Sequence, residues 1–327
     1  MSVFVSSVHE GGNGEMVIGM KLVNSDSMAP KLWWGMSHQP RDLDLIGKSA
    51  PMRALRRLMH SYAPYDVPLL LEGEEGTGKR LVAQIIHGLS PYRTGSFIAV
   101  DCSALSDMML AVELFGCEAG FCSGLAQSLP GKLELAWGGS LLLERIELMP
   151  NWVQGRLLRV LKTKSMERLG GIKPFSVYVR IMAATTGCLS RTTAGERHKD
   201  LMNCLSGGIP LRIPPLRERR GDISLLSYHF LAMANGELGK QVEGFSPAAR
   251  AALEAYSWPG NLRELYGVVQ SAVLAADRRI RPEQLPLPNP ARQASHVRNW
   301  HRNGLKRDRT PVPSASQTRA EGYGQRH

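Results

Sequence analysis

A short glycine-rich stretch between an apolar run and a helical pattern carries the clearest chemistry in the chain. Residues 67–71 predict a buried strand, and the apolar spacing over residues 80–89 predicts the helix that follows. A glycine-rich turn in that setting directs backbone N–H groups at phosphate oxygens, and the helix dipole adds favourable charge. Lys79, the last residue of the turn, would reach the outer phosphates. The predicted phosphate loop consists of Gly73, Glu74, Glu75, Gly76, Thr77, Gly78 and Lys79.

One position beside this loop departs from the usual pattern. Arg80 stands directly after the lysine, where such loops carry a serine or threonine. A plain glycine-rich turn is the alternative interpretation, but the strand, loop and helix in sequence favour phosphate binding.

Length and composition indicate a globular protein. The 327 residues are 43% hydrophobic, no run approaches the length of a membrane span, and the first residues lack the order of a signal peptide. We therefore expect a cytoplasmic protein. The five cysteines form no CxxC pair, which argues against a disulfide framework or a zinc site. The net charge of +11 suggests nucleic acid, but much of the excess lies near the C-terminal end of the sequence.

The pattern along the chain divides it into four parts. Residues 1–41 show no clear period and are expected to form a flexible N-terminal segment. Residues 42–217 alternate strand-like runs with helical patterns, which predicts an α/β fold with a mainly parallel sheet covered by helices. Residues 218–285 change to a helical period and predict a small helical domain, and the basic residues 286–327 are expected to be disordered. The strand-like runs are 68–71, 97–100, 140–143, 177–184 and 209–213.

Two helix starts in the helical part carry capping patterns. Ser246 followed by Pro247 is a cap with proline at the first helical position. Asn261 followed by Glu264 resembles a capping box. Both patterns predict that a helix begins there.

Taken in order along the chain, six motifs resemble the AAA+ domain of bacterial enhancer-binding proteins, the ATPases that activate sigma-54 RNA polymerase. The resemblance covers about residues 45–276. It implies a P-loop NTPase sheet with a helical lid, usually assembled as a ring with ATP between subunits. Each motif alone is weak, whereas the shared order is specific. Besides the phosphate loop, the motifs are Leu45-Ile46-Gly47-Lys48-Ser49, Glu113-Leu114-Phe115-Gly116, Leu157-Leu158-Arg159-Val160-Leu161, Pro214-Pro215-Leu216-Arg217-Glu218-Arg219 and Trp258-Pro259-Gly260-Asn261-Leu262-Arg263-Glu264-Leu265.

The resemblance implies that the nucleotide-binding parts are retained. The phosphate loop and Arg80, together with Ile46 of the entrance motif, would bind ATP. Arg263 matches the lid arginine that reaches the nucleotide phosphates in the family. A surface cation at a helix start is the alternative, although the helix dipole disfavours a cation there.

The family's second nucleotide motif is altered in this chain. In the family it ends a strand with an aspartate that holds Mg²⁺ and a glutamate that orients the attacking water. Glu144 and Arg145 occupy these positions here. Glu144 keeps a carboxylate, so weakened Mg²⁺ binding is expected, whereas a guanidinium has no acceptor and is always protonated. Glu147 is a less favoured substitute because it lies beyond the strand end.

Other positions that act in hydrolysis differ in the same direction. Asp101 stands where the family has the asparagine that holds the catalytic glutamate, and Thr186 where it has the residue that senses the γ-phosphate. The two arginines that reach a neighbouring subunit's ATP align with His198 and Cys204. Arg197 could substitute, but a displacement by one residue rotates a side chain by about 100° on a helix. Weak or absent hydrolysis is therefore expected.

Two of these replacements suggest a direct interaction. Where the family pairs asparagine with glutamate, this chain has Asp101 and Arg145. We expect a charge-assisted pair between them, in the place of the attacking water.

The parts that contact polymerase and DNA in the family also differ. The family's polymerase-contacting loop reads GAFTGA, whereas cysteine stands here at the key phenylalanine position, which disfavours productive contact with sigma-54. No second amphipathic helix follows Arg292, so no helix-turn-helix is expected. The basic tail could hold DNA phosphates nonspecifically, and a solvated tail or truncated remnant is the favoured alternative. The loop consists of Gly120, Phe121, Cys122, Ser123, Gly124 and Leu125.

These observations favour an ATP-binding AAA+ regulator of transcription with weak or absent ATP hydrolysis. It would respond to ATP in a ring with itself or a paralogous subunit, and would reach DNA weakly or through a partner. A fully active sigma-54-dependent activator and a non-functional remnant of one are the alternatives. An ATPase assay separates the first two, and failure to fold would favour the third.

Overall fold

The structure of the protein is a computed structural model. It describes residues 2–10, 16–23, 45–121, 127–186, 196–207 and 210–287. The main compact unit ends at Leu285. The tail predicted to be disordered, residues 286–327, lies outside the described residues from residue 288 on.

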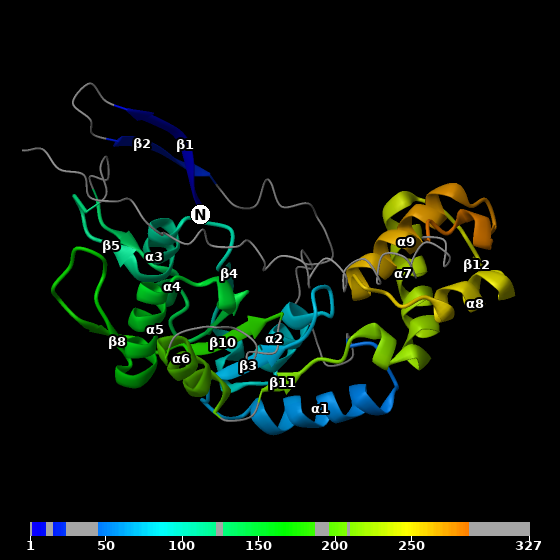
Figure 1. Ribbon diagram of the computed structural model, residues 1–327, viewed down its shortest axis with the longest axis horizontal. Helices are drawn as coiled ribbons and strands as arrows, with labels where there is room; N and C mark the ends of the chain where they lie inside the picture. The colour runs from blue at the N-terminus through cyan, green and yellow to red at the C-terminus, as the bar shows by residue number, and fades with distance from the viewer. Residues whose placement is uncertain are drawn as a thin grey trace, which may run out of the picture. The chain divides into compact units, whose positions relative to one another are not determined.

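A five-stranded sheet in the order β11-β3-β10-β7-β4 forms the centre of the compact unit, and every adjacent pair of strands is parallel (Figure 1). Parallel sheets are covered on both faces, which accounts for strands that are apolar nearly throughout. The predicted α/β class is confirmed, and each strand overlaps one of the five predicted runs. The strands are β3 (Leu69–Glu72), β4 (Phe97–Asp101), β7 (Ser140–Glu144), β10 (Arg180–Thr185) and β11 (Leu211–Arg212).

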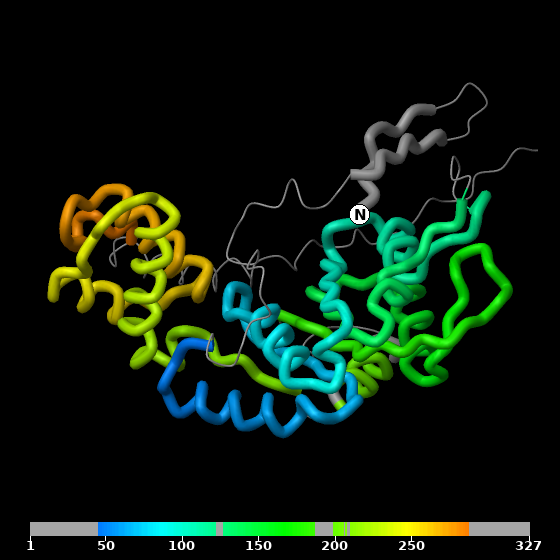
Figure 2. Tube along the Cα trace, turned by 180° about the vertical axis from the view of Figure 1, so that it is seen from behind, coloured from blue at the N-terminus to red at the C-terminus, as the bar shows by residue number. Residues whose placement is uncertain are grey.

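Helices cover both faces of this sheet (Figure 1 and Figure 2), and a hydrophobic core lies on each face. On β7, Leu141 and Leu143 belong to the core beneath α3, α5 and α6, whereas Leu142 belongs to the core beneath α1 and α2. This division follows from the two-residue side-chain period of a strand. The helices of this part are α1 (Ala50–Tyr62), α2 (Lys79–Gly88), α3 (Asp107–Phe115), α4 (Lys132–Leu135), α5 (Asn151–Thr163) and α6 (Glu196–Ser206).

A buried arginine joins the sheet to α1. Arg180 is 1% exposed, and its guanidinium donates to the carbonyls of Ala63 and Tyr62, each at 2.8 Å. A cation at the C-terminal end of a helix satisfies free carbonyls and complements the dipole. Arg180 also marks the observed start of β10, three residues after the predicted start.

Two small antiparallel ladders and several short 3-10 turns extend this part. β5 pairs with β6, and β8 pairs with β9. Their bounds are β5 (Gly116–Cys117), β6 (Leu129–Pro130), β8 (Ser165–Met166) and β9 (Phe175–Ser176), and the turns are η3 (Pro91–Thr94) and η4 (Ile146–Leu148).

The residues after β11 form the predicted helical part. The predicted cap at Ser246 is confirmed, since its Oγ accepts from the N–H of Ala249 at 3.2 Å. The elements are η6 (Leu216–Glu218), η7 (Arg220–Asp222), α7 (Ile223–Leu238), β12 (Gly244–Phe245), α8 (Pro247–Ala255), α9 (Asn261–Ala275), β13 (Arg279–Ile280) and η8 (Pro282–Gln284).

The predicted capping box at the start of α9 is wrong in one respect. Gly260 is the cap residue, and its N–H donates to Glu264 Oε2 at 2.7 Å. Asn261 is fully buried with a φ of 52°, a backbone conformation that asparagine tolerates better than most residues. Its side chain faces the phosphate loop instead of capping the helix.

The first forty residues contain regular structure that their sequence did not indicate. β1 (Ser2–Glu10) and β2 (Met16–Val23) pair as antiparallel strands, and both are rich in β-branched residues, which suit strands. None of the helices that the structure describes has the length and apolar character needed to span a bilayer.

Candidate functional site

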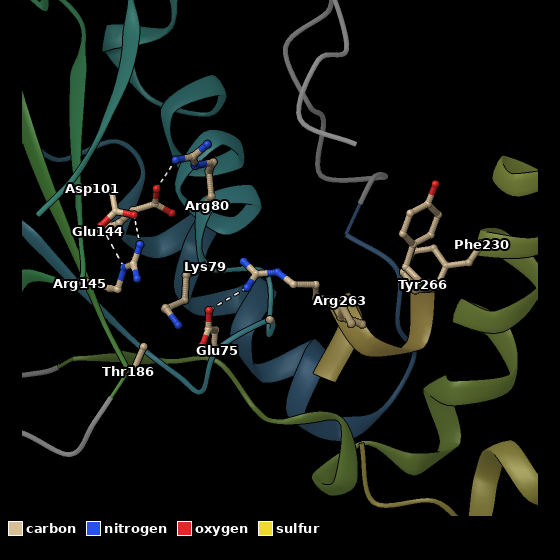
Figure 3. Close-up of a pocket in the computed structure, with 13 residues that line it drawn as sticks. Glu75, Lys79, Arg80, Asp101, Glu144, Arg145, Thr186, Phe230, Arg263 and Tyr266 are labelled. Carbon is tan, nitrogen blue, oxygen red and sulfur yellow. Dashed lines mark hydrogen bonds and ion pairs between the residues drawn. The ribbon is translucent and has the colours of Figure 1, made fainter. Parts of the chain in front are cut away.

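The candidate site is a cavity of 420 Å³ at the carboxyl ends of the central strands (Figure 3). β3, β4, β7 and β10 are parallel, so the residues that follow them gather at one edge of the sheet. The volume falls in the range of ligand sites of about 300–1,000 Å³. The residues that line it are Glu75, Gly76, Gly78, Lys79, Arg80, Asp101, Glu144, Arg145, Thr186, Phe230, Leu262, Arg263 and Tyr266.

Backbone geometry explains the glycines of the phosphate loop. Gly76 and Gly78 have φ values of 75° and 100°, which glycine adopts without steric cost. A Cβ atom on Gly76 would lie 2.2 Å from the carbonyl oxygen of Gly260. The N–H of Leu262 donates to the Gly76 carbonyl at 3.0 Å, so the loop lies directly against the start of α9.

Lys79, the first residue of α2, lies along the loop. Its ammonium donates to the carbonyls of Gly73 at 2.7 Å and Glu74 at 2.8 Å. Burial lowers the pKa of Lys79 below its ordinary value, although nearby carboxylates, Glu147 first among them, oppose this. A desolvated cation at the start of a helix suits an anionic group such as a phosphate.

Residues of the helical part hold the loop from outside. Arg217 pairs with both carboxylate oxygens of Glu74, one at 2.6 Å, and its hydrogen bonds hold the pKa of that carboxyl below the usual value. The Asn261 amide donates to the Glu75 carbonyl at 3.0 Å and accepts from the Leu216 N–H at 2.8 Å. The left-handed backbone conformation of Asn261, which is incompatible with the predicted capping role, thus places its side chain between the phosphate loop and the helical part.

Arg263 lies at the cavity but is engaged by the loop itself. It pairs with Glu75 at 2.8 Å, and both side chains are 69% exposed (Figure 3). Ion pairs this exposed are weak and exchange readily with other partners. Arg263 therefore lies at the cavity, and its role as the lid arginine stays a prediction.

Asp101 and Arg145 form the predicted pair. Arg145 Nε donates to Asp101 Oδ1 at 3.0 Å, and its Nη2 bonds to the other carboxylate oxygen (Figure 3). Burial alone would raise the pKa of Asp101, but hydrogen bonds from Arg145 and Ser103 outweigh it and place that pKa below its ordinary value. Arg145 has a φ of 53°, so it leaves the strand in a left-handed conformation.

Arg80 and Glu144 form a second ion pair, which sequence reasoning missed. Arg80 lies on the first turn of α2 and Glu144 is the last residue of β7. The two side chains are 33% and 22% exposed, respectively, and both line the cavity. The opposite charges of Arg80 and Glu144 are the one signal of this pair in the sequence.

Glu147 contacts the sensor position. Its Oε1 accepts from the Thr186 N–H at 3.1 Å and from the Thr186 hydroxyl at 2.6 Å. Burial raises the pKa of Glu147, but the hydrogen bonds from Thr186 outweigh this and the pKa lies below its usual value. Oε2 of Glu147 is buried without a hydrogen-bond partner among the described residues.

The remaining predicted positions are only partly placed. Ile46 is half-buried and does not line the cavity. Cys204 packs against the core beneath α6, and the side chain of His198 lies outside the described residues. Of the polymerase-contacting loop, Gly120 and Phe121 are described, and Cys122, Ser123, Gly124 and Leu125 are not.

Three apolar or aromatic residues of the lid complete the cavity and were not predicted. Phe230 on α7 and Tyr266 on α9 make an edge-to-face contact with ring centroids 5.4 Å apart, and Leu262 lies beside the loop. Helical periodicity can place Phe230 on one face of α7, and Leu262 and Tyr266 on one face of α9, but it cannot show that these faces border a ligand site.

Comparison with known proteins agrees with this geometry. Residues 45–207 match the sigma-54 interaction domain, and residues 217–300 match the AAA+ ATPase lid domain. The C4-dicarboxylate transport transcriptional regulatory protein DctD of Rhizobium meliloti is 41% identical over 236 residues, which are 72% of this chain and 51% of that protein. The Psp operon transcriptional activator of Escherichia coli is 39% identical over 232 residues, 70% of this chain and 71% of that one.

Solved structures agree as well. The crystal structure of NtrX from Brucella abortus in complex with ATP has a TM-score of 0.67 and 31% identity, covering 81% of this chain and 61% of that one. The ADP complex has a TM-score of 0.68 and 32% identity, covering 80% of this chain and 62% of that one.

The chain spans about half the length of DctD. With both domain models matched in order and the Psp activator covered over most of its length, the chain belongs to the family of sigma-54-dependent AAA+ transcription activators.

Proposed function

We propose that the chain is a nucleotide-binding regulator of transcription that binds ATP and hydrolyses it weakly or not at all. The observation that carries this proposal is the bidentate pair between Asp101 and Arg145. These two residues stand where the family has an asparagine and a water-orienting glutamate. Residues 42–217 would form the nucleotide-binding part and residues 218–285 its lid.

The residues present fit a nucleoside triphosphate. Gly76 and Gly78 leave no side chain between the loop backbone and a ligand, and Lys79 supplies a partly desolvated cation. Arg263 lies at the cavity from the lid side, while Phe230, Leu262 and Tyr266 supply an apolar wall. ATP and ADP complexes of NtrX support nucleotide binding at the same fold.

The same residues do not fit hydrolysis. A water molecule attacks phosphorus efficiently only when a group with a free lone pair orients it and accepts its proton. The Arg145 guanidinium has no lone pair to offer, and the Asp101 carboxylate is engaged by that guanidinium and by Ser103. Neither group can therefore take the part of the missing glutamate.

Binding without turnover still allows a switch. A ligand shifts a conformational equilibrium by its differential affinity for the two states, whether or not it is consumed. Direct contacts between the loop and α9 make lid position a suitable response, since Asn261 and Leu262 bond to the loop backbone. We propose that the state is detected in the cytoplasm by sigma-54 polymerase or by a related AAA+ subunit in a ring, and that DNA is reached through such a partner.

One titration tests this proposal. Purified chain is titrated with ATP by calorimetry, and phosphate release is measured at the saturating concentration. We expect saturable binding and a turnover far below the usual enzyme range of about 1–10³ s⁻¹. The double variant Asp101→Asn/Arg145→Glu, which restores the family's residues, should release phosphate faster than the wild type. Absence of ATP binding would refute the proposal, and wild-type turnover within the usual range would favour a fully active activator.

A further inference from the structure

The ion pair between Arg80 and Glu144 stands where P-loop NTPases hold their metal ion. In those enzymes the hydroxyl after the loop lysine and a carboxylate at a strand end bind Mg²⁺. Here the first position is Arg80 and the second is Glu144. Their side chains pair directly, and both line the cavity (Figure 3).

The residues present do not fit Mg²⁺. This ion requires near-octahedral oxygen ligands, and a guanidinium has five donors and no acceptor. The Glu144 carboxylate is engaged by Arg80, and the Asp101 carboxylate is engaged by Arg145. These contacts favour a site without Mg²⁺ over the weakened Mg²⁺ binding expected of Glu144.

The replacement preserves positive charge where the phosphates would lie. A guanidinium is planar and permanently charged, and it pairs with phosphate through two parallel hydrogen bonds. The lining of the cavity carries four cations against three carboxylates: Lys79, Arg80, Arg145 and Arg263 against Glu75, Asp101 and Glu144. The lining charges sum to +1, so Arg80 adds a positive charge on the side where the phosphates would lie, whereas a divalent cation in the same place would meet Arg80 and Arg145.

We propose that this chain binds nucleoside triphosphate in its metal-free form, with the Arg80 guanidinium in the place of the divalent cation. The inference rests on the proposed nucleotide binding and specifies which form of nucleotide is bound. Glu144 orients Arg80, and Arg80 exchanges part of its pairing with Glu144 for the phosphate when nucleotide binds. A metal-free site agrees with a chain that retains its nucleotide and does not turn it over, because the metal also neutralises charge that develops during phosphoryl transfer.

The test compares ATP binding with and without divalent cation. The full chain is titrated with ATP by calorimetry in EDTA and in excess Mg²⁺ at matched ionic strength. We expect the dissociation constant for ATP in EDTA to be lower than in Mg²⁺, or higher by no more than about threefold. Binding that Mg²⁺ strengthens by about tenfold or more would overturn the inference and leave the proposed function intact. Absence of binding under both conditions would overturn both.

Variants sharpen the comparison. Arg80→Ser/Glu144→Asp restores a hydroxyl and a shorter carboxylate, and it should make binding about tenfold or more dependent on Mg²⁺. Arg57→Ser removes an exposed arginine of α1 that does not line the cavity, and it should leave the EDTA and Mg²⁺ affinities as in the wild type. Circular dichroism melting establishes that each variant is folded. If the double variant is unfolded, the wild-type comparison alone decides the matter.

Discussion

Asp101 and Glu144 are register partners on neighbouring parallel strands, and each carboxylate is held by a different arginine. Arg145 holds Asp101 from the residue directly after β7, and Arg80 holds Glu144 from the first turn of α2. Two cross-site ion pairs thus lie at the positions where we expect the family's metal ligands and water-orienting residue. In the proposed function these pairs oppose hydrolysis, while the phosphate loop beside them binds the ligand.

Lys79→Ala should weaken ATP binding by roughly tenfold to more than hundredfold. The Lys79 ammonium is the cation of the loop itself, and hydrogen bonds to a charged group contribute about 1.5–3 kcal/mol, which corresponds to roughly tenfold to more than hundredfold in affinity. Calorimetric titration of the variant with ATP checks this. Lys240→Ala, a lysine of the lid that does not line the cavity, serves as the control. Unchanged affinity in Lys79→Ala would place the nucleotide elsewhere.

Gly76→Ala should destabilise the loop and weaken nucleotide binding. A Cβ atom there would lie 2.2 Å from the Gly260 carbonyl oxygen, and the φ of 75° disfavours any side chain. We expect a loss of more than about 1 kcal/mol in the free energy of unfolding by urea. Gly155→Ala is the matched control, because Gly155 lies within α5 with open space around it. That change should stabilise by up to about 1 kcal/mol, and equal effects of the two substitutions would contradict this account of the loop.

Arg180→Met should lower stability without affecting the cavity directly. The substitution removes two buried hydrogen bonds to the end of α1 and leaves the carbonyls of Tyr62 and Ala63 without these donors. An unsatisfied buried polar group costs about 1–3 kcal/mol, so a loss of roughly 2–4 kcal/mol in urea unfolding is expected. Arg159→Met, at a 67% exposed side chain on α5, should change stability by less than about 1 kcal/mol. A smaller loss at Arg180 than at Arg159 would show that the buried arginine is not structural.

Acid should weaken the fold partly through Asp101. Its folded pKa lies below the ordinary value of 3.8, so the unfolded chain binds the proton more readily as pH falls. Asp101 therefore contributes to stability at pH values above 3.8, and this contribution is lost as the pH falls through the folded pKa. The difference in unfolding free energy between wild type and Asp101→Asn should be largest near neutral pH and shrink in acid. Glu72 and Glu113, whose pKa values are raised by burial, act in the opposite sense in both proteins and cancel in this comparison. A difference that grows as pH falls would contradict the pairing.

Much of the fold followed from local sequence pattern. The strand-like runs became the five strands of the sheet because parallel strands are apolar on both faces and stand out as continuous runs. The pairing of Asp101 with Arg145 was predictable because both residues replaced family members known to interact. Arg80 and Glu144 carry opposite charges at two positions that share one metal ion in P-loop NTPases, but their contact crosses β10 in the order β3-β10-β7, and sequence spacing alone does not show it.

Asn261 shows a different limit of sequence reasoning. Its type and its distance from Glu264 fit a capping box, yet the structure uses it in a left-handed conformation to join Glu75 and Leu216. A residue that suits caps also suits left-handed turns, so residue type alone could not separate the two. The lid aromatics Phe230 and Tyr266 were missed for a similar reason, because a helical pattern identifies a face but not what that face borders.

The central claim, that ATP binds and is hydrolysed weakly or not at all, is tested most directly by a single-turnover experiment. Radiolabelled ATP is mixed with excess wild-type chain in EDTA and again in Mg²⁺, and bound nucleotide is recovered over time and separated into ATP and ADP. The account predicts that the bound nucleotide remains ATP under both conditions. Conversion to ADP in Mg²⁺ at a rate of about 1 s⁻¹ or faster would contradict it.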